Sequence, residues 1–196
     1  MAKHYTVLLC IWLAFPGQAE DSNGDFAIKG AGLQSCGSLV EAWDGRTEDI
    51  ALYAGWIDGY VTGMNQNLED TFDVAPWQSV QTLLGLTTEV CRNLDESEMF
   101  ITAFNDLMKD FAVHRVRQKQ NAIAVTNGDT AIALYKETLL RVKQRLSENG
   151  FDPGGLDHQF TDQTRTAIEA FQASKGIAVT GLPDQQTLFL LFVRTQ

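Results

Sequence analysis

The chain has 196 residues, with 25 Asp and Glu against 15 Lys and Arg, and therefore a formal net charge of -10. This acidity argues against nucleic acid and anionic membrane surfaces as partners, because both attract basic surfaces. Hydrophobic residues make up 44% of the sequence, which is enough for packed cores in one domain or two small ones.

The first 19 residues have the features of a secretory signal peptide. Lys3 precedes an apolar run over residues 7–15, and small residues precede a cleavage point near Ala19. The run is far shorter than the roughly 20 residues of a membrane span, and no later run is long enough either. We therefore expect a periplasmic or secreted protein that is not an integral membrane protein.

Removal of the signal peptide takes Cys10 with it and leaves Cys36 and Cys91 as the two cysteines of the mature chain. In an oxidising compartment we expect them to form a disulfide, which contributes about 4 kcal/mol for a loop of this length. Two buried free thiols are the alternative. A catalytic thiol is disfavoured, because no His lies near either cysteine in the sequence.

Four helices are predicted between about residues 26 and 111, because apolar residues recur there at helical spacing. The first contains Cys36, Leu39, Val40 and Trp43, the second runs from Thr47 to Met64, the third from Pro76 to Cys91, and the fourth from Asp95 and Glu98 to Phe111. With the Cys36–Cys91 disulfide, these helices predict a compact all-α domain over residues 26–111.

The second predicted helix carries Gly55, Gly59 and Gly63 in a GxxxGxxxG series. Asp58 inside the series and Asn65 after it argue against a bilayer, where such a series forms a dimerisation face. Each glycine costs the helix about 1 kcal/mol in propensity. We therefore expect this face to pack closely against another helix, since a contact must offset the loss.

Residues 112–128 are predicted to be a linker or a fraying extension of the preceding helix. Their basic run consists of His114, Arg115, Arg117 and Lys119, and is typical of a solvated face or of a contact with acidic groups. Three further helices are predicted over residues 129–196. The first begins at Asp129 or Thr130 and stops at Gly150, the second is capped by Thr161 and ends at Gly176, and the third is capped by Asp184.

Many residues of this half follow the spacing of a single sequence pattern. They are Val142, Leu146, Gly150-Phe151, Pro153-Gly154, Asp157, Phe160, Thr164, Ala167-Ile168, Phe171-Gln172, Gly176-Ile177, Val179-Thr180-Gly181, Asp184 and Thr187-Leu188. In this pattern residues 129–196 resemble the three-helix peptidoglycan-binding domain found at the ends of many cell-wall hydrolases. The chain departs from the family at His158 and Thr161, which replace two loop glycines, at Lys143, where Gln is usual, and at Asn149, where Leu is usual.

The resemblance implies a three-helix fold and a peptidoglycan-binding surface around the loop before the second helix. The candidate binding residues, which would meet sugar hydroxyls or the stem peptide, are Asp157, His158, Gln159, Thr161, Arg165 and Gln172. For Asp157 and Thr164 a structural role is also expected, in which they hold the loop by hydrogen bonds to the backbone. The fold carries over from the family better than the ligand does.

The sequence predicts no metal, no cofactor and no catalytic centre. Asp152, Asp157 and Asp162 are spaced by five, whereas an EF-hand needs ligands at alternate positions and a Glu at the twelfth. His114 and His158 lack zinc-site spacing, and there is no Gly-x-Ser-x-Gly elbow or phosphate loop. A non-catalytic protein is therefore favoured, with a peptidoglycan hydrolase left as an alternative, because carboxylate pairs are abundant in the chain.

The N-terminal half offers a weaker resemblance, carried by the helix with Tyr53, Trp56, Gly59, Tyr60 and Gly63 and by the two cysteines. It is similar to small periplasmic helical proteins, either acid-stress chaperones or immunity proteins that block cell-wall amidase toxins. This resemblance implies a protein partner in the cell envelope. We therefore expect an exported protein that binds peptidoglycan with its C-terminal half and a protein with its N-terminal half; the alternative is an immunity protein or chaperone that the C-terminal half only positions.

Overall fold

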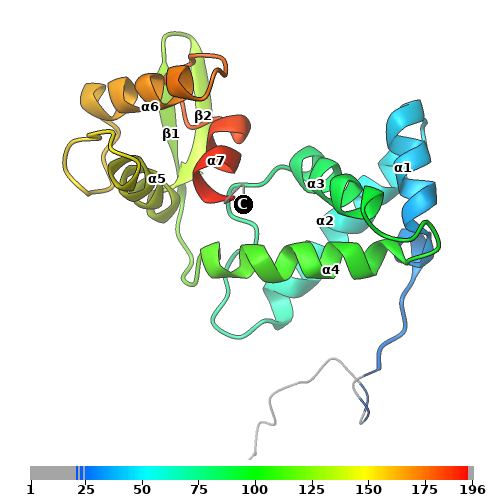
Figure 1. Ribbon diagram of the computed structural model, residues 1–196. Helices are drawn as coiled ribbons and strands as arrows, with labels where there is room; N and C mark the ends of the chain where they lie inside the picture. Colours follow the sequence, from blue (N-terminus) through cyan, green and yellow to red (C-terminus); the bar gives the residue numbers. More distant parts are fainter. Residues whose placement is uncertain (1–20, 22, 24, 194–196) are drawn as a thin grey trace, which may run out of the picture.

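The computed structural model describes residue 21, residue 23 and residues 25–193, so the predicted signal peptide lies outside the described residues. The elements in chain order are η1 (Gly30–Leu33), α1 (Cys36–Gly45), α2 (Ile50–Asn67), α3 (Val80–Arg92), α4 (Phe100–Phe111), η2 (Ala112–His114), β1 (Ala122–Asn127), β2 (Thr130–Tyr135), α5 (Lys136–Glu148), α6 (Asp162–Ser174) and α7 (Gln185–Phe192). Figure 1 shows α1 to α4 on one side and the hairpin with α5 to α7 on the other.

The four predicted N-terminal helices are present, but three begin later than expected. Helix α2 begins at Ile50 rather than Thr47, α3 at Val80 and α4 at Phe100. For α3 the reason is Ser79, whose hydroxyl caps the helix by accepting from the Thr82 amide at 3.1 Å. Before α4, Asp95 instead accepts hydrogen bonds from Ser97 in a separate turn.

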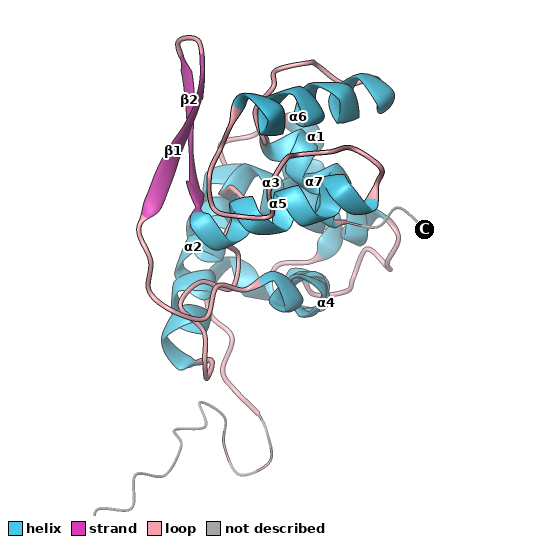
Figure 2. Cartoon of the chain, turned by 90° about the vertical axis from the view of Figure 1, so that its left-hand side faces the viewer, coloured by secondary structure: helices cyan, strands magenta, loops and turns pink. Residues whose placement is uncertain are grey.

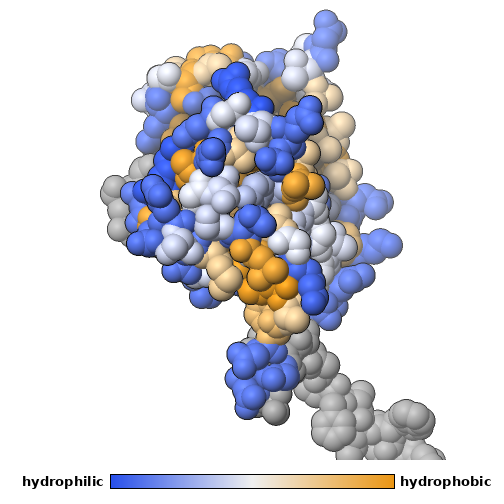
Figure 3. Space-filling model, turned by 90° about the vertical axis from the view of Figure 1, so that its right-hand side faces the viewer, coloured by the Kyte–Doolittle hydropathy of each residue, from blue (hydrophilic) through white to orange (hydrophobic). Residues whose placement is uncertain are grey.

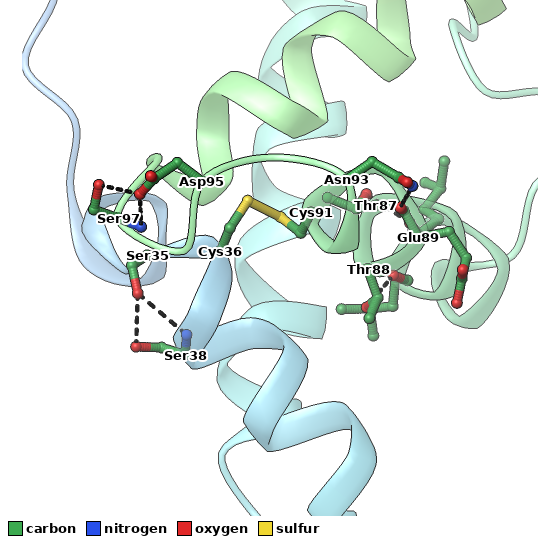
Figure 4. The surroundings of a disulfide bond; sticks show 12 residues. Ser35, Cys36, Ser38, Thr87, Thr88, Glu89, Cys91, Asn93, Asp95 and Ser97 are labelled. Carbon is green, nitrogen blue, oxygen red and sulfur yellow. Dashed lines mark hydrogen bonds between the residues drawn. A yellow bond between two sulfur atoms is a disulfide. The ribbon is translucent and has the colours of Figure 1, made fainter.

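The expected disulfide is confirmed. Cys36 and Cys91 are bonded to each other, so the bridge ties the start of α1 to the end of α3 (Figure 4). Both cysteines are buried in a core that includes Leu39, Phe100 and Phe104, none of which is exposed to solvent. Helix α1 begins beside the bridge because the Ser35 hydroxyl accepts from the Ser38 amide at 3.1 Å.

The expectation that the glycine series of α2 packs against another helix is wrong. A Cβ atom built at Gly55, Gly59 or Gly63 would meet no heavy atom within 4 Å outside its own helix. A glycine that is tightly packed is Gly32 in η1, where a Cβ would overlap the ring of Trp56. The spacing of the three glycines permits a close approach of backbones, but in this chain no helix among the described residues occupies that face.

The all-α prediction is also corrected, because β1 and β2 form an antiparallel hairpin (Figure 2). Ile123 pairs with Leu134 and Val125 pairs with Ile132, and this face turns inward, since Val125 and Leu134 are buried. The two-residue loop begins with Gly128, whose φ of 57° suits glycine. Part of the segment expected to be a linker is therefore strand.

The hairpin also changes the next predicted helix, which begins at Lys136 instead of Asp129 or Thr130. The last two predicted helices are confirmed, because Thr161 caps α6 and Asp184 caps α7 with their side-chain oxygens. The fold is mostly helical, with one disulfide and one two-stranded sheet.

The two halves are in direct contact. The ring of Phe192 in α7 lies 5.7 Å from that of Trp77 and 5.1 Å from that of His114. The Oε1 atom of Gln185 accepts from the Ser79 amide at 3.0 Å and from the Thr82 hydroxyl at 2.6 Å. Buried residues of both halves consequently belong to one continuous hydrophobic cluster.

The surface seen from the α1 side is largely hydrophilic, with a compact apolar patch near the point where the N-terminal segment leaves the fold (Figure 3). Phe26 and Leu33, from the first described segment, are 46% and 56% exposed. Within residues 25–193, no helix is both long and apolar enough to cross a membrane.

Candidate functional site

The loop between α5 and α6 contains most of the predicted binding residues. It leaves α5 through Gly150, whose φ is 85°, and passes Pro153-Gly154 before reaching Asp157, His158 and Gln159. These last three residues are exposed, as is Leu156, which is 57% exposed. The loop therefore presents one charged, two polar and one apolar side chain to solvent.

A buried lysine fixes the centre of this loop. The Nζ atom of Lys143 in α5 donates to Asp157 Oδ1 at 2.6 Å and to the Gln159 carbonyl at 3.1 Å. The Lys143 side chain is 1% exposed, and a buried ammonium group needs such partners to offset its lost hydration. Lys143 is thus the anchor of the loop, at the position where the resembling family usually has Gln.

Asp157 completes the anchor, as its expected structural role requires. Its Oδ1 atom also accepts from the Gln159 amide at 3.0 Å. The pKa of Asp157 is lowered, first by the hydrogen bond from the Lys143 ammonium and then by that from the Gln159 amide. The same two hydrogen bonds therefore favour the charged form of the carboxylate.

The start of α6 fixes the other end of the loop. Thr161 and Thr164 form a capping box, in which the Thr161 hydroxyl accepts from the Thr164 amide at 3.2 Å. The Thr164 hydroxyl donates to the Pro153 carbonyl at 3.0 Å, so it also ties the Pro-Gly turn to the helix. Thr161 can take the place of a loop glycine because the N-cap position needs an extended backbone, not a left-handed one.

Arg165 lies on a different part of α6. Its guanidinium pairs with Asp162 at 2.9 Å and lies 4.0 Å from Glu169. Its side chain borders the turn at Gly181, where a Cβ would lie 2.9 Å from Arg165 Cγ. The same turn is held by Asn127 of the hairpin, whose amide donates to the Thr180 carbonyl at 2.9 Å. Arg165 is therefore directed toward the α6–α7 turn, whereas Asp157 is held by α5.

Gln172 does not belong to a binding surface, which corrects the sequence-based expectation. It is 0% exposed, and its Nε2 atom donates to the Leu182 carbonyl at 2.9 Å and the Thr187 hydroxyl at 2.8 Å. Its Oε1 atom accepts from the amides of Thr180 and Gly181 at 2.8 and 2.9 Å. The side chain uses its hydrogen-bonding capacity inside the protein and shapes the turn before α7.

The other two aspartates of the loop region have local partners. Asp152 accepts from the Gly154 amide and from Gln163 Nε2, both at 2.9 Å, and Asp162 pairs with Arg165. Within the described part of the chain no three His, Cys, Asp or Glu side chains are grouped so that they could hold a metal ion. Asp152, Asp157 and Asp162 therefore serve separate local contacts.

Comparison with known proteins supports this assignment of the C-terminal half. Residues 136–191 match the family model described as "Putative peptidoglycan binding domain". The match confirms the resemblance of this half and leaves that of the N-terminal half without support. Together with the disulfide, it favours a cell-envelope or other extracytoplasmic location.

Comparison of the whole chain adds one weak structural likeness. No curated protein matches it in sequence. A crystal structure of SltB3 from Pseudomonas aeruginosa, in complex with NAG-anhNAM-pentapeptide, is 20% identical, with a TM-score of 0.29. That alignment covers 56% of this chain and 26% of the other, so this chain spans about a quarter of its length. Such a score is too low to relate the two folds.

Sequence reasoning overlooked two residues that build the site. Lys143 departs from the family pattern, and its place on the same helical face as Leu139 and Leu146 is the signal that favours a buried lysine with a counter-charge. Asn127 precedes Gly128 between alternating apolar residues, a pattern that is typical of a hairpin.

Proposed function

We propose that the protein is a non-catalytic, exported component of the cell envelope, which binds peptidoglycan through its C-terminal half and a protein partner through its N-terminal half. The observation that carries the first part is the family match over residues 136–191. Its candidate contact surface is the exposed loop around Asp157, which the Lys143 ammonium holds in place. Export through a cleaved signal peptide and the binding of a protein partner are likewise proposed.

The chemistry of the loop suits glycan or peptide recognition. His158, Gln159 and Thr161 are exposed neutral or weakly basic groups that hydrogen-bond with sugar hydroxyls and peptide amides. Leu156 adds an apolar contact for the face of a sugar ring. Because Asp157 and the capping box fix the loop before binding, less conformational entropy is lost when the ligand binds. Arg165, which pairs with Asp162 and borders the α6–α7 turn, is proposed as a separate contact for a ligand carboxylate.

The wall-binding part is tested by co-sedimentation of the mature chain with purified peptidoglycan sacculi, with the supernatant analysed for released muropeptides. We expect the protein in the pellet and no muropeptides in the supernatant. Retention should persist when salt is raised, because the proposed contacts are mainly hydrogen bonds between neutral groups. Protein that stays in the supernatant across salt and pH would refute wall binding, and muropeptide release would favour the hydrolase alternative.

The partner-binding part is supported by the open face of α2. Leu52 is 65% exposed, and the neighbouring glycine series has nothing packed on it among the described residues. An immunity protein or chaperone would use the same face, so this alternative needs its own test. Inhibition of a cell-wall amidase by the purified chain would favour the immunity reading, whereas protection of unfolded clients from aggregation would favour the chaperone.

A further inference from the structure

A groove of about 810 Å³ lies between η1, α1 and α2, in the half of the protein that does not contain the wall-binding loop. Ser38 and Glu41 line it from α1, and Asp49, Tyr53 and Trp56 line it from the start of α2. Leu52, at its edge, is 65% exposed, whereas Tyr53 is only 4% exposed. The groove thus combines aromatic and aliphatic surface with two carboxylates.

The aromatic side of the groove is held rigidly. The indole N–H of Trp56 donates to the Lys29 carbonyl at 2.7 Å, and its ring stacks on Tyr60 with centroids 4.7 Å apart. Phe100 packs against the edge of Trp56 at 5.1 Å, and Gly32 lets η1 approach the indole closely. A ligand would therefore meet a preformed surface, which reduces the entropic cost of binding.

The two carboxylates have no cationic partner. Neither Glu41 nor Asp49 makes an ion pair or a side-chain hydrogen bond within the described residues, and no Lys or Arg lines the groove. Nearby Asp44, in contrast, is paired with Arg92. The negative potential reaches the groove wall: burial raises the pKa of the Tyr53 hydroxyl, and the charge of Asp49 raises it further.

The aromatic surface and the two carboxylates indicate which kind of ligand the groove can bind. Carboxylates beside aromatic rings attract a cation, and the aliphatic stem of Arg or Lys packs on apolar surface while its head stays polar. Anionic ligands are repelled, both by the two carboxylates and by the overall charge of -10. We propose that this groove binds a Lys or Arg side chain of a protein partner. The proposal rests on the partner-binding part of the proposed function and specifies its chemistry.

The test measures binding of three short peptides to the mature chain. Binding is followed by NMR of the backbone amide and Trp indole N–H signals. The probes are Ac-Leu-Arg-Leu-NH2, the same peptide with citrulline, which is a neutral isostere of Arg, and the same peptide with Glu. We expect saturable shifts at residues 52–56 and at the Trp56 indole with the Arg peptide only. Raising salt from about 50 mM to about 300 mM should weaken this binding severalfold, because the attraction is between charges.

Two variants with equal net charge identify the site. Glu41→Gln/Asp49→Asn should weaken binding of the Arg peptide at least fivefold, whereas Glu69→Gln/Asp110→Asn, which changes two exposed carboxylates elsewhere, should leave it within twofold. Equal binding of the citrulline peptide, equal loss in both variants, or shifts caused by a soluble muropeptide at residues 52–56 would overturn the proposal. Sacculus binding is measured on the same samples. If the Arg peptide does not bind but the protein still binds sacculi, only this inference is refuted. If the Arg peptide binds but the protein does not bind sacculi, only wall binding is refuted.

Discussion

At the scale of a residue, Gln172 shows that a sequence pattern can identify a position in a fold without indicating whether its side chain is buried. The spacing of Phe171-Gln172 places this residue within the family pattern, but it does not tell whether the amide points to solvent or to the interior. In the fold, the amide replaces water for the backbone groups of the turn between α6 and α7. Its role is therefore to support the surface rather than to contact a ligand.

Substitution of Gln172 by Leu should lower the free energy of unfolding by about 3 kcal/mol or more, because each buried polar group left without a partner costs about 1–3 kcal/mol. Urea denaturation followed by circular dichroism measures the change. The control is Gln144→Leu at an exposed position of α5, which should stay within about 0.5 kcal/mol of the wild type. A Gln172→Leu variant as stable as this control would contradict the structural role of the amide.

At the scale of an element, α2 and the hairpin show two limits of reading a pattern. A GxxxGxxxG series indicates that another backbone can approach the helix closely. It does not indicate whether another segment of the chain lies there. The helix predicted from Asp129 or Thr130 includes the second strand, because Leu139, Val142 and Leu146 follow helical spacing directly after it, whereas Asn127-Gly128 favours a turn with strands on either side. The caps Thr161 and Asp184 were predictable, because capping depends on neighbours three residues away.

The open face of α2 leads to a prediction about its glycines. Gly59→Ala should raise the free energy of unfolding by about 1 kcal/mol, because Ala has the higher helix propensity and its Cβ meets no other group here. Gly32→Ala is the matched contrast and should destabilise the protein, since its Cβ would overlap the Trp56 ring. Thermal unfolding of both variants measures the two signs. Destabilisation by Gly59→Ala would show that this face is packed in the isolated protein.

At the scale of the whole molecule, the sequence predicted two helical halves but not how they join. The contacts of Phe192 with Trp77 and His114 connect residues far apart in the chain, and no local pattern contains that information. The loop of the candidate site was largely predictable, because Asp157 and Thr164 act on near neighbours. The helical spacing places Lys143 among buried residues, but its partner Asp157 was not predictable, since that contact joins α5 to the following loop.

His114 should make the contact between the halves sensitive to pH. Burial lowers the pKa of His114 below its ordinary value of 6.5, and the charges of Arg141 and Arg145 lower it further. The unfolded chain therefore binds a proton first, so stability is constant above that value and falls as pH decreases toward the folded-state pKa. The melting temperature of the wild type should fall more between about pH 7 and about pH 5 than that of His114→Gln, which does not titrate. Parallel curves for the two proteins would contradict this role.

The most direct test of the account is the affinity for sacculi of a variant altered only in the candidate loop, Leu156→Ala/His158→Ala/Gln159→Ala. These side chains are exposed, so the anchor between Lys143 and Asp157 should persist. The control, Leu33→Ala/Gln66→Ala/Gln118→Ala, removes matched exposed side chains elsewhere. The account predicts that the loop variant binds at least tenfold more weakly, which corresponds to about 1.4 kcal/mol, and that the control binds like the wild type. Unchanged binding of the loop variant, or an equal loss in the control, would contradict it.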